Sequence, residues 1–365
     1  MTDANESALR VSPGCVAPEP PQDLITRVAN RRRSLSRQQY VDGILRGERA
    51  ILAQAITLIE SSRAADREMA EQIVEDCLPH GGKSIRVGIT GVPGAGKSSL
   101  IEAIGTYLID QHTQKVAVLA IDPSSQVSGG SILGDKTRMT SLSTSEMAFI
   151  RPSPSRGHSG GVAQRTREAM LLCEAAGYQN ILIETVGVGQ SETAVHDMVD
   201  FFLLILLAGA GDELQGIKRG VMEMADLVAI NKADGTNLAA AERAGTEAQN
   251  ALHYFPSFAS RWTPRVLTCS AVTGKSIPDL WNCVLEHNAL IRANGWLNLN
   301  RQYQTRTWMH EIIQQQLREQ FESHPAIREH MGDLEQEVME GRTTSFRAAR
   351  TLLEMYSGPE AAKAE

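Results

Sequence analysis

The chain has 365 residues, which is enough for two modules or for one large domain with appendages. Hydrophobic residues make up 42% of it and charged residues 22%, a balance typical of soluble globular proteins. Its 36 basic and 43 acidic residues give a formal charge of −7, which argues against a general nucleic-acid-binding surface. The five cysteines are far apart, so neither a disulfide framework nor a structural zinc site is predicted.

Residues 1–35 are expected to form a disordered tail, because they are rich in proline and acidic side chains and contain no apolar run. They look like neither a secretory nor a mitochondrial signal, which predicts a cytoplasmic protein. Apolar residues then recur at helical spacing over residues 36–60, where Ser36 is a candidate cap, and again over residues 64–78. Residues 36–83 are therefore predicted to form an N-terminal helical module.

Between residues 84 and 295, short apolar runs alternate with helical patterns. This alternation predicts an α/β fold with a mostly parallel sheet between helices. The longest apolar run, residues 201–208, is too short to span a membrane. The last helix of this region is predicted to begin with a capping box formed by Ser276 and Asp279. The predicted strands are 85–90, 116–121, 147–150, 180–184, 201–207, 227–231 and 265–269, and the predicted helices are 97–112, 162–176, 216–224, 237–254 and 277–293.

After residue 296 the strand pattern ends, and apolar residues again recur at helical spacing. An apolar stripe on a helix needs a surface to pack against, either on the same chain or on another copy. Residues 296–365 are therefore predicted to form a helical arm that either folds back on the α/β domain or pairs with another subunit, and self-association is the favoured alternative. The residues of these stripes are Trp308, Ile312, Ile313, Leu317, Phe321, Ile327, Met331, Leu334, Val338, Leu352, Leu353 and Tyr356.

The first motif that carries chemistry is Gly91-Val92-Pro93-Gly94-Ala95-Gly96-Lys97-Ser98, which matches the P-loop pattern GxxxxGK[ST] between a predicted strand and helix. In such a loop, backbone N–H groups and the amino end of the helix bind phosphate oxygens. Lys97 is expected to reach the β- and γ-phosphates, and the Ser98 hydroxyl to bind Mg²⁺. The predicted phosphate-binding residues are Gly91, Gly94, Ala95, Gly96, Lys97, Ser98 and Ser99.

The second motif, Asn231-Lys232-Ala233-Asp234, follows a predicted strand and fits the guanine signature NKxD. The Asp234 carboxylate can accept hydrogen bonds from N1–H and the 2-amino group of guanine, and adenine offers neither donor. Asn231 is expected to brace the loop, and Lys232 to lie along the base. At the end of the last strand, Ser270 and Ala271 form an SA pair, which typically offers a backbone N–H to guanine O6.

Three acidic residues between the P-loop and the guanine signature predict a magnesium site. Asp122 ends the second strand, Asp135 lies in the loop that follows, and Glu184 ends the fourth strand. Together with Ser98 they are the predicted metal ligands, and Asp122, Glu184 and Lys97 are candidate catalytic residues. Some of these acids can alternatively serve only to cap loops.

Residues around the predicted γ-phosphate position bear on hydrolysis. Gly187 stands where a switch glycine contacts γ-phosphate, and the next residue is Val188, which cannot orient water as a glutamine would; Gln190 is the remaining candidate. We therefore expect slow hydrolysis that a partner accelerates. The glycine-rich segment 209–220 predicts a loop that reports nucleotide state, with Lys218 as a further catalytic candidate, although a plain surface loop is the alternative.

These segments occur in an order and at spacings that resemble one family. They are GVPGAGKSS, AIDPSSQVSGGSILGDKTRM, residues 150–167, ETVGVGQSE, GDELQGIKRG and NKAD. Over roughly residues 38–355 the chain resembles the MeaB/ArgK family of P-loop GTPases, bacterial relatives of the methylmalonic aciduria type A protein. It departs from the family in Gln126, which stands where a proline is expected, and in its longer tail.

The resemblance implies a P-loop NTPase G domain over residues 84–295 that binds GTP and GDP with Mg²⁺ and hydrolyses GTP. It implies a chaperone of an adenosylcobalamin-dependent acyl-CoA mutase, chiefly methylmalonyl-CoA mutase. Such a chaperone gates cofactor loading and protects or reactivates the mutase. It also implies a homodimer joined by the C-terminal arm, and a nucleotide-sensing switch at residues 209–220.

Three other functions are compatible with parts of this sequence. A metallochaperone GTPase would need a cluster of Cys or His residues, and the nine His residues here are scattered. An ATP-using kinase linked to amino-acid transport would leave the Asp234 carboxylate without its partners. A binding module in which hydrolysis is only a timer overlaps with the chaperone function. Neither nucleic acid nor membrane is expected as a partner.

Overall fold

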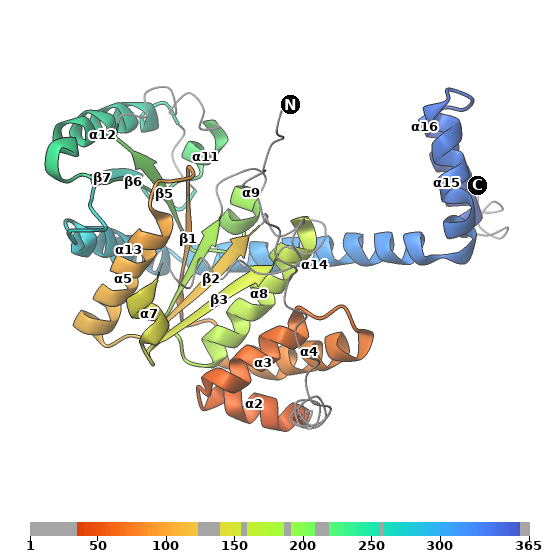
Figure 1. Cartoon of the computed structure of the whole chain (residues 1–365), viewed down its shortest axis with the longest axis horizontal. Helices are drawn as coiled ribbons and strands as arrows, with labels where there is room; N and C mark the ends of the chain where they lie inside the picture. Colours follow the sequence, from red (N-terminus) through yellow and green to blue (C-terminus); the bar gives the residue numbers. More distant parts are fainter. Residues whose placement is uncertain are drawn as a thin grey trace, which may run out of the picture.

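The computed structural model describes residues 35–122, 139–154, 159–185, 191–208, 219–255 and 259–357. Its centre is one seven-stranded sheet in the order β3-β2-β4-β1-β5-β6-β7 (Figure 1). All its neighbouring strand pairs are parallel, as the alternation of strand and helix patterns predicts. The strands are β1 (Ile85–Gly91), β2 (Val116–Asp122), β3 (Ala148–Pro154), β4 (Asn180–Thr185), β5 (Phe201–Leu207), β6 (Leu227–Asn231) and β7 (Arg265–Thr268).

The helices lie before, between and after these strands. Helices α5 and α13 have the predicted bounds, whereas α7 and α9 are short helices that the sequence pattern did not indicate. The helices are α2 (Arg37–Leu45), α3 (Arg49–Ile59), α4 (Ala64–Cys77), η1 (Leu78–His80), α5 (Lys97–His112), α7 (Thr140–Thr144), α8 (Ser159–Ala175), α9 (Ser191–His196), α11 (Arg219–Glu223), η3 (Gly235–Asn237), α12 (Leu238–Leu252), α13 (Ile277–Ala293), α14 (Trp296–Ser323), α15 (Pro325–Met339) and α16 (Ser345–Ser357).

The single helix predicted over residues 36–60 is wrong, because α2 and α3 are separate. Between them Gly47 has φ of +74°, outside the helical range, and Glu48 N–H donates back to the Gly43 carbonyl at 2.9 Å. The helical period continues across this turn, which is why the pattern alone does not reveal it. The cap at Ser36 is confirmed as a capping box with Gln39.

Two further predictions differ from the structure at element ends. The capping box at Ser276 is wrong: this residue has φ of +59°, and its side chain makes no capping hydrogen bond. An N-cap side chain reaches the first turn from an extended backbone, which this left-handed conformation does not provide. Strand β3 runs on through Pro152 to Pro154, beyond the predicted end at Ile150. It is an edge strand, where a missing N–H costs no internal ladder bond.

The core forms on both faces of the sheet because alternate residues of each strand point to opposite sides. Helices α5, α7 and α13 pack on one face and share an apolar cluster with β1 residues such as Val87 and Ile89. Helices α8 and α9 cover the other face, and α11 and α12 cover its β5–β6 side. The N-terminal helices α2–α4 pack on the outside of α8 and share its apolar cluster through residues such as Ile44 and Ile73.

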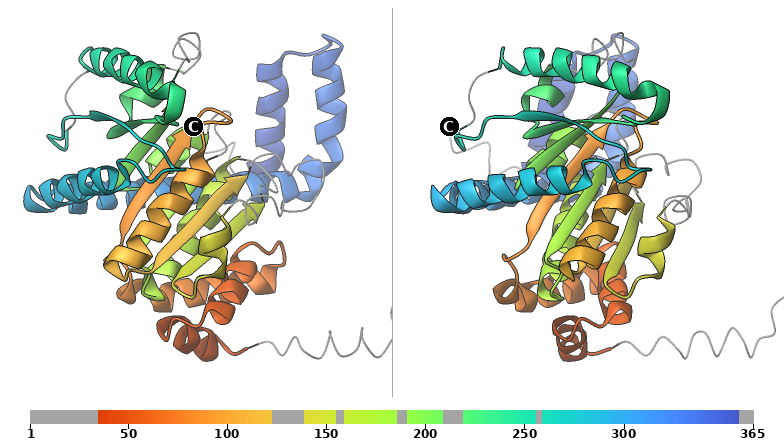
Figure 2. Two further views of the ribbon diagram at one scale, coloured as in Figure 1. Left: turned by 60° about the vertical axis from the view of Figure 1, so that its left-hand side comes forward. Right: turned by 90° about the vertical axis from the view of Figure 1, so that its left-hand side faces the viewer.

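Helix α14 crosses the body of the molecule and then extends beyond it (Figure 1), carrying α15 and α16 as a hairpin at its far end (Figure 2). Its first turns are fixed by Arg301, whose guanidinium binds Asp200 at 2.6 and 2.8 Å. Gln304 adds a bond of 2.8 Å to the Val199 carbonyl. These contacts hold the root of the arm at the amino ends of β1 and β5.

Candidate nucleotide-binding site

The P-loop connects β1 to α5 at the carboxyl edge of the sheet, where ligands bind in parallel α/β folds. Gly91 ends the strand and Lys97 begins the helix, so the first-turn N–H groups of α5 face the loop. Gly96 has φ of +85°, and a Cβ there would lie 2.6 Å from Asn231 Nδ2. The loop therefore needs glycine at this position to approach the guanine-signature strand.

Lys97 is buried within the loop. Its ammonium donates to the Gly91 carbonyl at 2.8 Å and to the Val92 carbonyl at 3.2 Å. Ser99 is exposed on the outer side of the first turn. The lysine thus lies where a bound phosphate would compete with carbonyl oxygens for its ammonium group, and a full negative charge is the stronger acceptor.

Ser98 and Glu184 are brought together across the site. The Ser98 hydroxyl donates to Glu184 Oε1 at 3.0 Å, and both residues are buried. Parallel pairing of β1 with β4 sets Glu184 beside Ile89, close to the start of the P-loop. A neighbouring contact was not predicted from the sequence: the Thr185 hydroxyl donates to the Thr90 hydroxyl at 2.8 Å in the core.

Asp122 ends β2 at the same edge of the sheet, because β2 pairs in parallel with β4. Its side chain is outside what the structure describes, as are Asp135, Gly187, Val188, Gln190 and Lys218. Within the described part of the chain, no group of three or more His, Cys, Asp or Glu side chains is placed to hold a metal ion. The predicted set of three acids therefore stays a prediction.

The guanine-signature residues form a hydrogen-bonded unit with the P-loop. Asn231 is buried at the end of β6, and its Nδ2 donates to the Ala95 carbonyl at 2.8 Å. Its Oδ1 accepts the Ala271 N–H at 3.2 Å. Asn231 therefore braces the phosphate-binding loop against the loop that follows β7. The Ala271 N–H, expected to face guanine O6, is directed to Asn231 in this structure.

Asp234 lies beside Ser270, whose hydroxyl donates to the carboxylate. The same hydroxyl accepts the Thr273 N–H at 3.2 Å. Ser270 therefore orients the carboxylate that is predicted to read the base, a role that the sequence did not indicate. Lys232 is exposed with φ of +58°, and its carbonyl accepts a bond from Asn237 at 3.0 Å.

No helix in the described ranges is both long enough and apolar enough to cross a membrane.

Comparison with known proteins agrees with this geometry. The family model described as "Methylmalonyl Co-A mutase-associated GTPase MeaB" matches residues 52–326. GTPase ArgK of Escherichia coli is 50% identical over 271 residues, 74% of this chain and 82% of that protein. The mitochondrial methylmalonic aciduria type A homolog of Mus musculus is 46% identical over 333 residues, 87% of this chain and 80% of that protein.

The fold also matches a solved structure. A crystal structure titled "LAO/AO transport system kinase" superposes with a TM-score of 0.71 at 36% identity, covering 89% of this chain and 99% of that one. Sequence motifs, parallel sheet and P-loop geometry agree with these matches. The chain therefore belongs to the MeaB family of GTPases.

Proposed function

We propose that this GTPase is a nucleotide-controlled chaperone of an adenosylcobalamin-dependent acyl-CoA mutase, and that methylmalonyl-CoA mutase is its partner. The observation that carries the proposal is the family match over residues 52–326, whose description names association with that mutase. In this role the chaperone gates cofactor loading and protects or reactivates the mutase. The useful work is a change in affinity for the partner between the GTP and GDP states.

The nucleotide is held at two ends in this proposal. Backbone N–H groups of the P-loop and Lys97 bind the phosphates, while Asp234 accepts two hydrogen bonds from guanine. The close packing of Gly96 against Asn231 supports the proposal, since it joins the two ends into one rigid unit. Adenine would offer no donor to the partly buried Asp234 carboxylate, so GTP is preferred over ATP.

Mg²⁺ fits the residues present at the phosphate end. The Ser98 hydroxyl and the Glu184 carboxylate lie 3.0 Å apart and are the hard oxygen donors that Mg²⁺ prefers. Ser98 would coordinate the ion directly, and Glu184 would accept hydrogen bonds from its coordinated waters. Asp122 and Asp135 are further candidates for binding the ion or its waters. When bound, the ion neutralises charge on the transferred phosphate. Lys97 adds a second positive charge on the same group.

We propose that the arm makes the chain a homodimer. Leu299, Tyr303, Ile313 and Leu317 follow one face of α14 and are 44–66% exposed. The residues of α14 that contact the body, Arg301 and Gln304 among them, lie on the opposite face. An apolar face of this length on a projecting helix favours a second copy as its partner.

The decisive experiment measures binding of the purified mutase to the chain loaded with GDP or with a non-hydrolysable GTP analogue. We expect the two affinities to differ by about tenfold or more, which corresponds to a coupling free energy of about 1.4 kcal/mol or more. Isobutyryl-CoA and ethylmalonyl-CoA mutases, tested alongside, identify the partner. Equal binding in both states, or no binding, would contradict the proposal.

A second measurement addresses hydrolysis. In single-turnover assays we expect slow GTP hydrolysis by the chain alone and faster hydrolysis when the mutase is added. Calorimetry with ATP in place of GTP separates this function from an ATP-using kinase. Rapid turnover by the isolated chain, or equal affinity for both nucleotides, would overturn this part of the proposal.

A further inference from the structure

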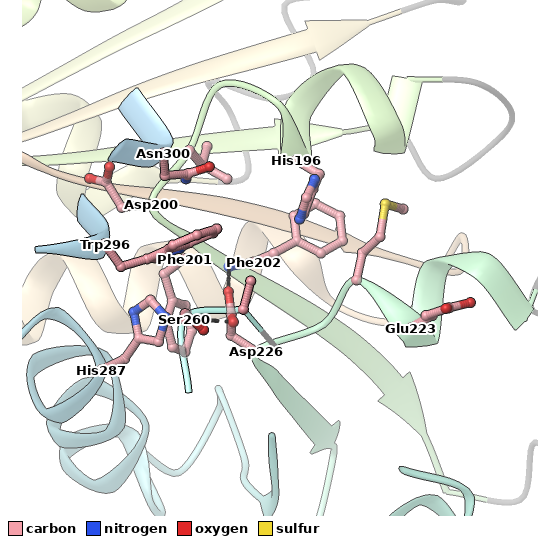
Figure 3. Close-up of a pocket in the computed structure, with 13 residues that line it drawn as sticks. His196, Asp200, Phe201, Phe202, Glu223, Asp226, Ser260, His287, Trp296 and Asn300 are labelled. Atoms are coloured by element: carbon pink, nitrogen blue, oxygen red, sulfur yellow. Dashed lines mark hydrogen bonds and ion pairs between the residues drawn. The ribbon is translucent and has the colours of Figure 1, made fainter. Parts of the chain in front are cut away.

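A second pocket lies at the amino-terminal edge of the sheet, opposite the P-loop. Its volume is about 270 Å³, and it opens where β5 and β6 begin. Figure 3 shows the side chains around it, which come from five helices and strands as well as from the segments between them. Trp296 reaches it from the root of the arm and His196 from α9. None of the predicted nucleotide- or metal-binding residues is among the described residues that line this pocket.

Acidic and aromatic side chains dominate the lining. Three of the described lining residues are Asp or Glu, and none of them is Lys or Arg. Asp200 already has a cationic partner in Arg301. Asp226 and Glu223 have no such partner among the described residues of the lining. The rings of Phe202 and Trp296 border the same space and offer π-electron density.

Two buried polar groups in the lining are incompletely bonded. Asp226 Oδ2 accepts the Phe202 N–H at 2.8 Å, and Asp226 Oδ1 lies 3.6 Å from His287 Nε2. His287 is only 3% exposed, and its Nδ1 has no hydrogen-bond partner within the described part of the chain. The 3.6 Å contact is longer than a hydrogen bond, and in the neutral tautomer that carries its hydrogen on Nε2 the His287 Nδ1 atom is an acceptor. Ser260, Asn300 and the Trp296 indole supply neutral donors to the lining, so what the described lining lacks is a Lys or Arg cation to face Asp226 and Glu223.

A ligand that complements Asp226, Glu223 and His287 Nδ1 supplies positive charge and N–H donors, and it is flat or small enough to lie beside aromatic rings. An anion would face uncompensated carboxylates, and a neutral amide would gain no charge pairing. We propose that this pocket binds a small organic cation with N–H donors, of the amidinium or primary ammonium type. The site is separate from the nucleotide site, so the proposal does not depend on the GTPase function.

The test uses benzamidine as the cationic probe, with benzamide and benzoate as neutral and anionic analogues of the same shape. Calorimetry on the full chain with GDP present is expected to give saturable binding of benzamidine, at least about tenfold tighter than benzamide or benzoate. In NMR spectra of ¹⁵N-histidine-labelled protein, the His287 ring signals should shift on titration with benzamidine.

Two variants keep the test independent of folding defects. Glu223→Gln changes an exposed carboxylate at the rim, and Trp296→Leu removes a half-buried ring. Each is expected to weaken benzamidine binding, whereas the matched change Glu247→Gln on the exposed side of α12 leaves it unchanged. No binding of benzamidine, equal binding of benzoate, or unaltered binding in both pocket variants would overturn the proposal.

Discussion

Asp234 is the residue on which discrimination between purines depends in the proposed site. Replacing it with Asn keeps the size of the side chain but leaves only one acceptor atom and adds a donor. We expect Asp234→Asn to lower GDP affinity about 100-fold and to improve binding of xanthosine diphosphate, whose C2 carbonyl accepts from the new amide. Nucleotide titration measures both changes. Asp279→Asn, an exposed acid on α13, is the control and should bind GDP normally.

Gly96 shows how one missing methyl group allows two motifs to meet. Gly94 and Gly96 have similar positive φ angles, +80° and +85°, so alanine at either position meets a similar penalty for a left-handed φ. Only at Gly96 does the new Cβ meet a neighbour, Asn231 Nδ2 at 2.6 Å, whereas at Gly94 the space is open. We expect Gly96→Ala to lower the free energy of unfolding of the nucleotide-free chain by about 1 kcal/mol or more beyond Gly94→Ala. Equal losses in urea denaturation would contradict this reading.

At the scale of elements, α14 is attached to the sheet through a buried ion pair. The Asp200 side chain is 2% exposed and Arg301 is its partner from the arm. Arg301→Gln leaves that carboxylate buried without a cation, so we expect a loss of about 3–5 kcal/mol in the free energy of unfolding. Arg306→Gln, on an exposed position of the same helix, should cost less than about 0.5 kcal/mol. Urea denaturation of the two variants decides the matter.

Asp226 and His287 join the start of β6 to α13, and burial shifts their pKa values in opposite directions. Burial raises the pKa of Asp226 to about 7 and lowers the pKa of His287 to about 4. Asp226 therefore contributes stability at low pH that is lost as pH rises toward 7. His287 contributes stability above about pH 6.5, its unfolded value, that is lost as pH falls toward 4. Between those limits the two contributions oppose each other.

Replacing either member of this pair should leave the other member to set how the free energy of unfolding changes with pH. Relative to the parent chain, the Asp226→Asn variant is expected to gain stability as pH rises from 4 to 7. The His287→Gln variant is expected to gain stability, again relative to the parent chain, as pH falls from 6.5 to 4. Each slope should approach about 1.4 kcal/mol per pH unit. The charged groups that face the pair are His196 on α9, Glu223 on α11, and Asp200 with Arg301 at the arm root. The measurement is the free energy of unfolding of the parent and both variants across this pH range. The same pH dependence in all three proteins would contradict the assigned pKa shifts.

At the scale of the whole molecule, the arm presents an apolar face away from the body. If that face joins two copies, a charge within it should separate them. We expect Leu317→Glu to convert a dimer to a monomer in sedimentation equilibrium, with the buried root of the arm intact. Gln316→Glu, at the adjacent exposed position, is the control and should leave the dimer unchanged. A monomeric parent chain, or a dimer that survives Leu317→Glu, would exclude this interface.

Local patterns were sufficient for the motifs and most elements. The P-loop, the guanine signature and the strand–helix alternation depend on residues close in sequence, and the bounds of α5 and α13 follow from them. Local patterns failed where backbone conformation interrupts an intact period, as at Gly47, or excludes a cap, as at Ser276. The spacing of residues in the sequence shows which side chains a segment contains, but it does not show the backbone dihedral angles that orient those side chains.

The sequence by itself determined the P-loop and guanine-signature motifs, and with them the prediction of a phosphate-binding loop and a guanine-reading carboxylate, because both motifs reside in short contiguous segments. Only the tertiary structure decided what surrounds them. The Thr90–Thr185 contact, the Ser270 hydroxyl on Asp234 and the pocket at the opposite edge join residues far apart in the chain. Those contacts depend on the strand order β3-β2-β4-β1-β5-β6-β7, and strand order is set by packing of the whole sheet rather than by any local pattern.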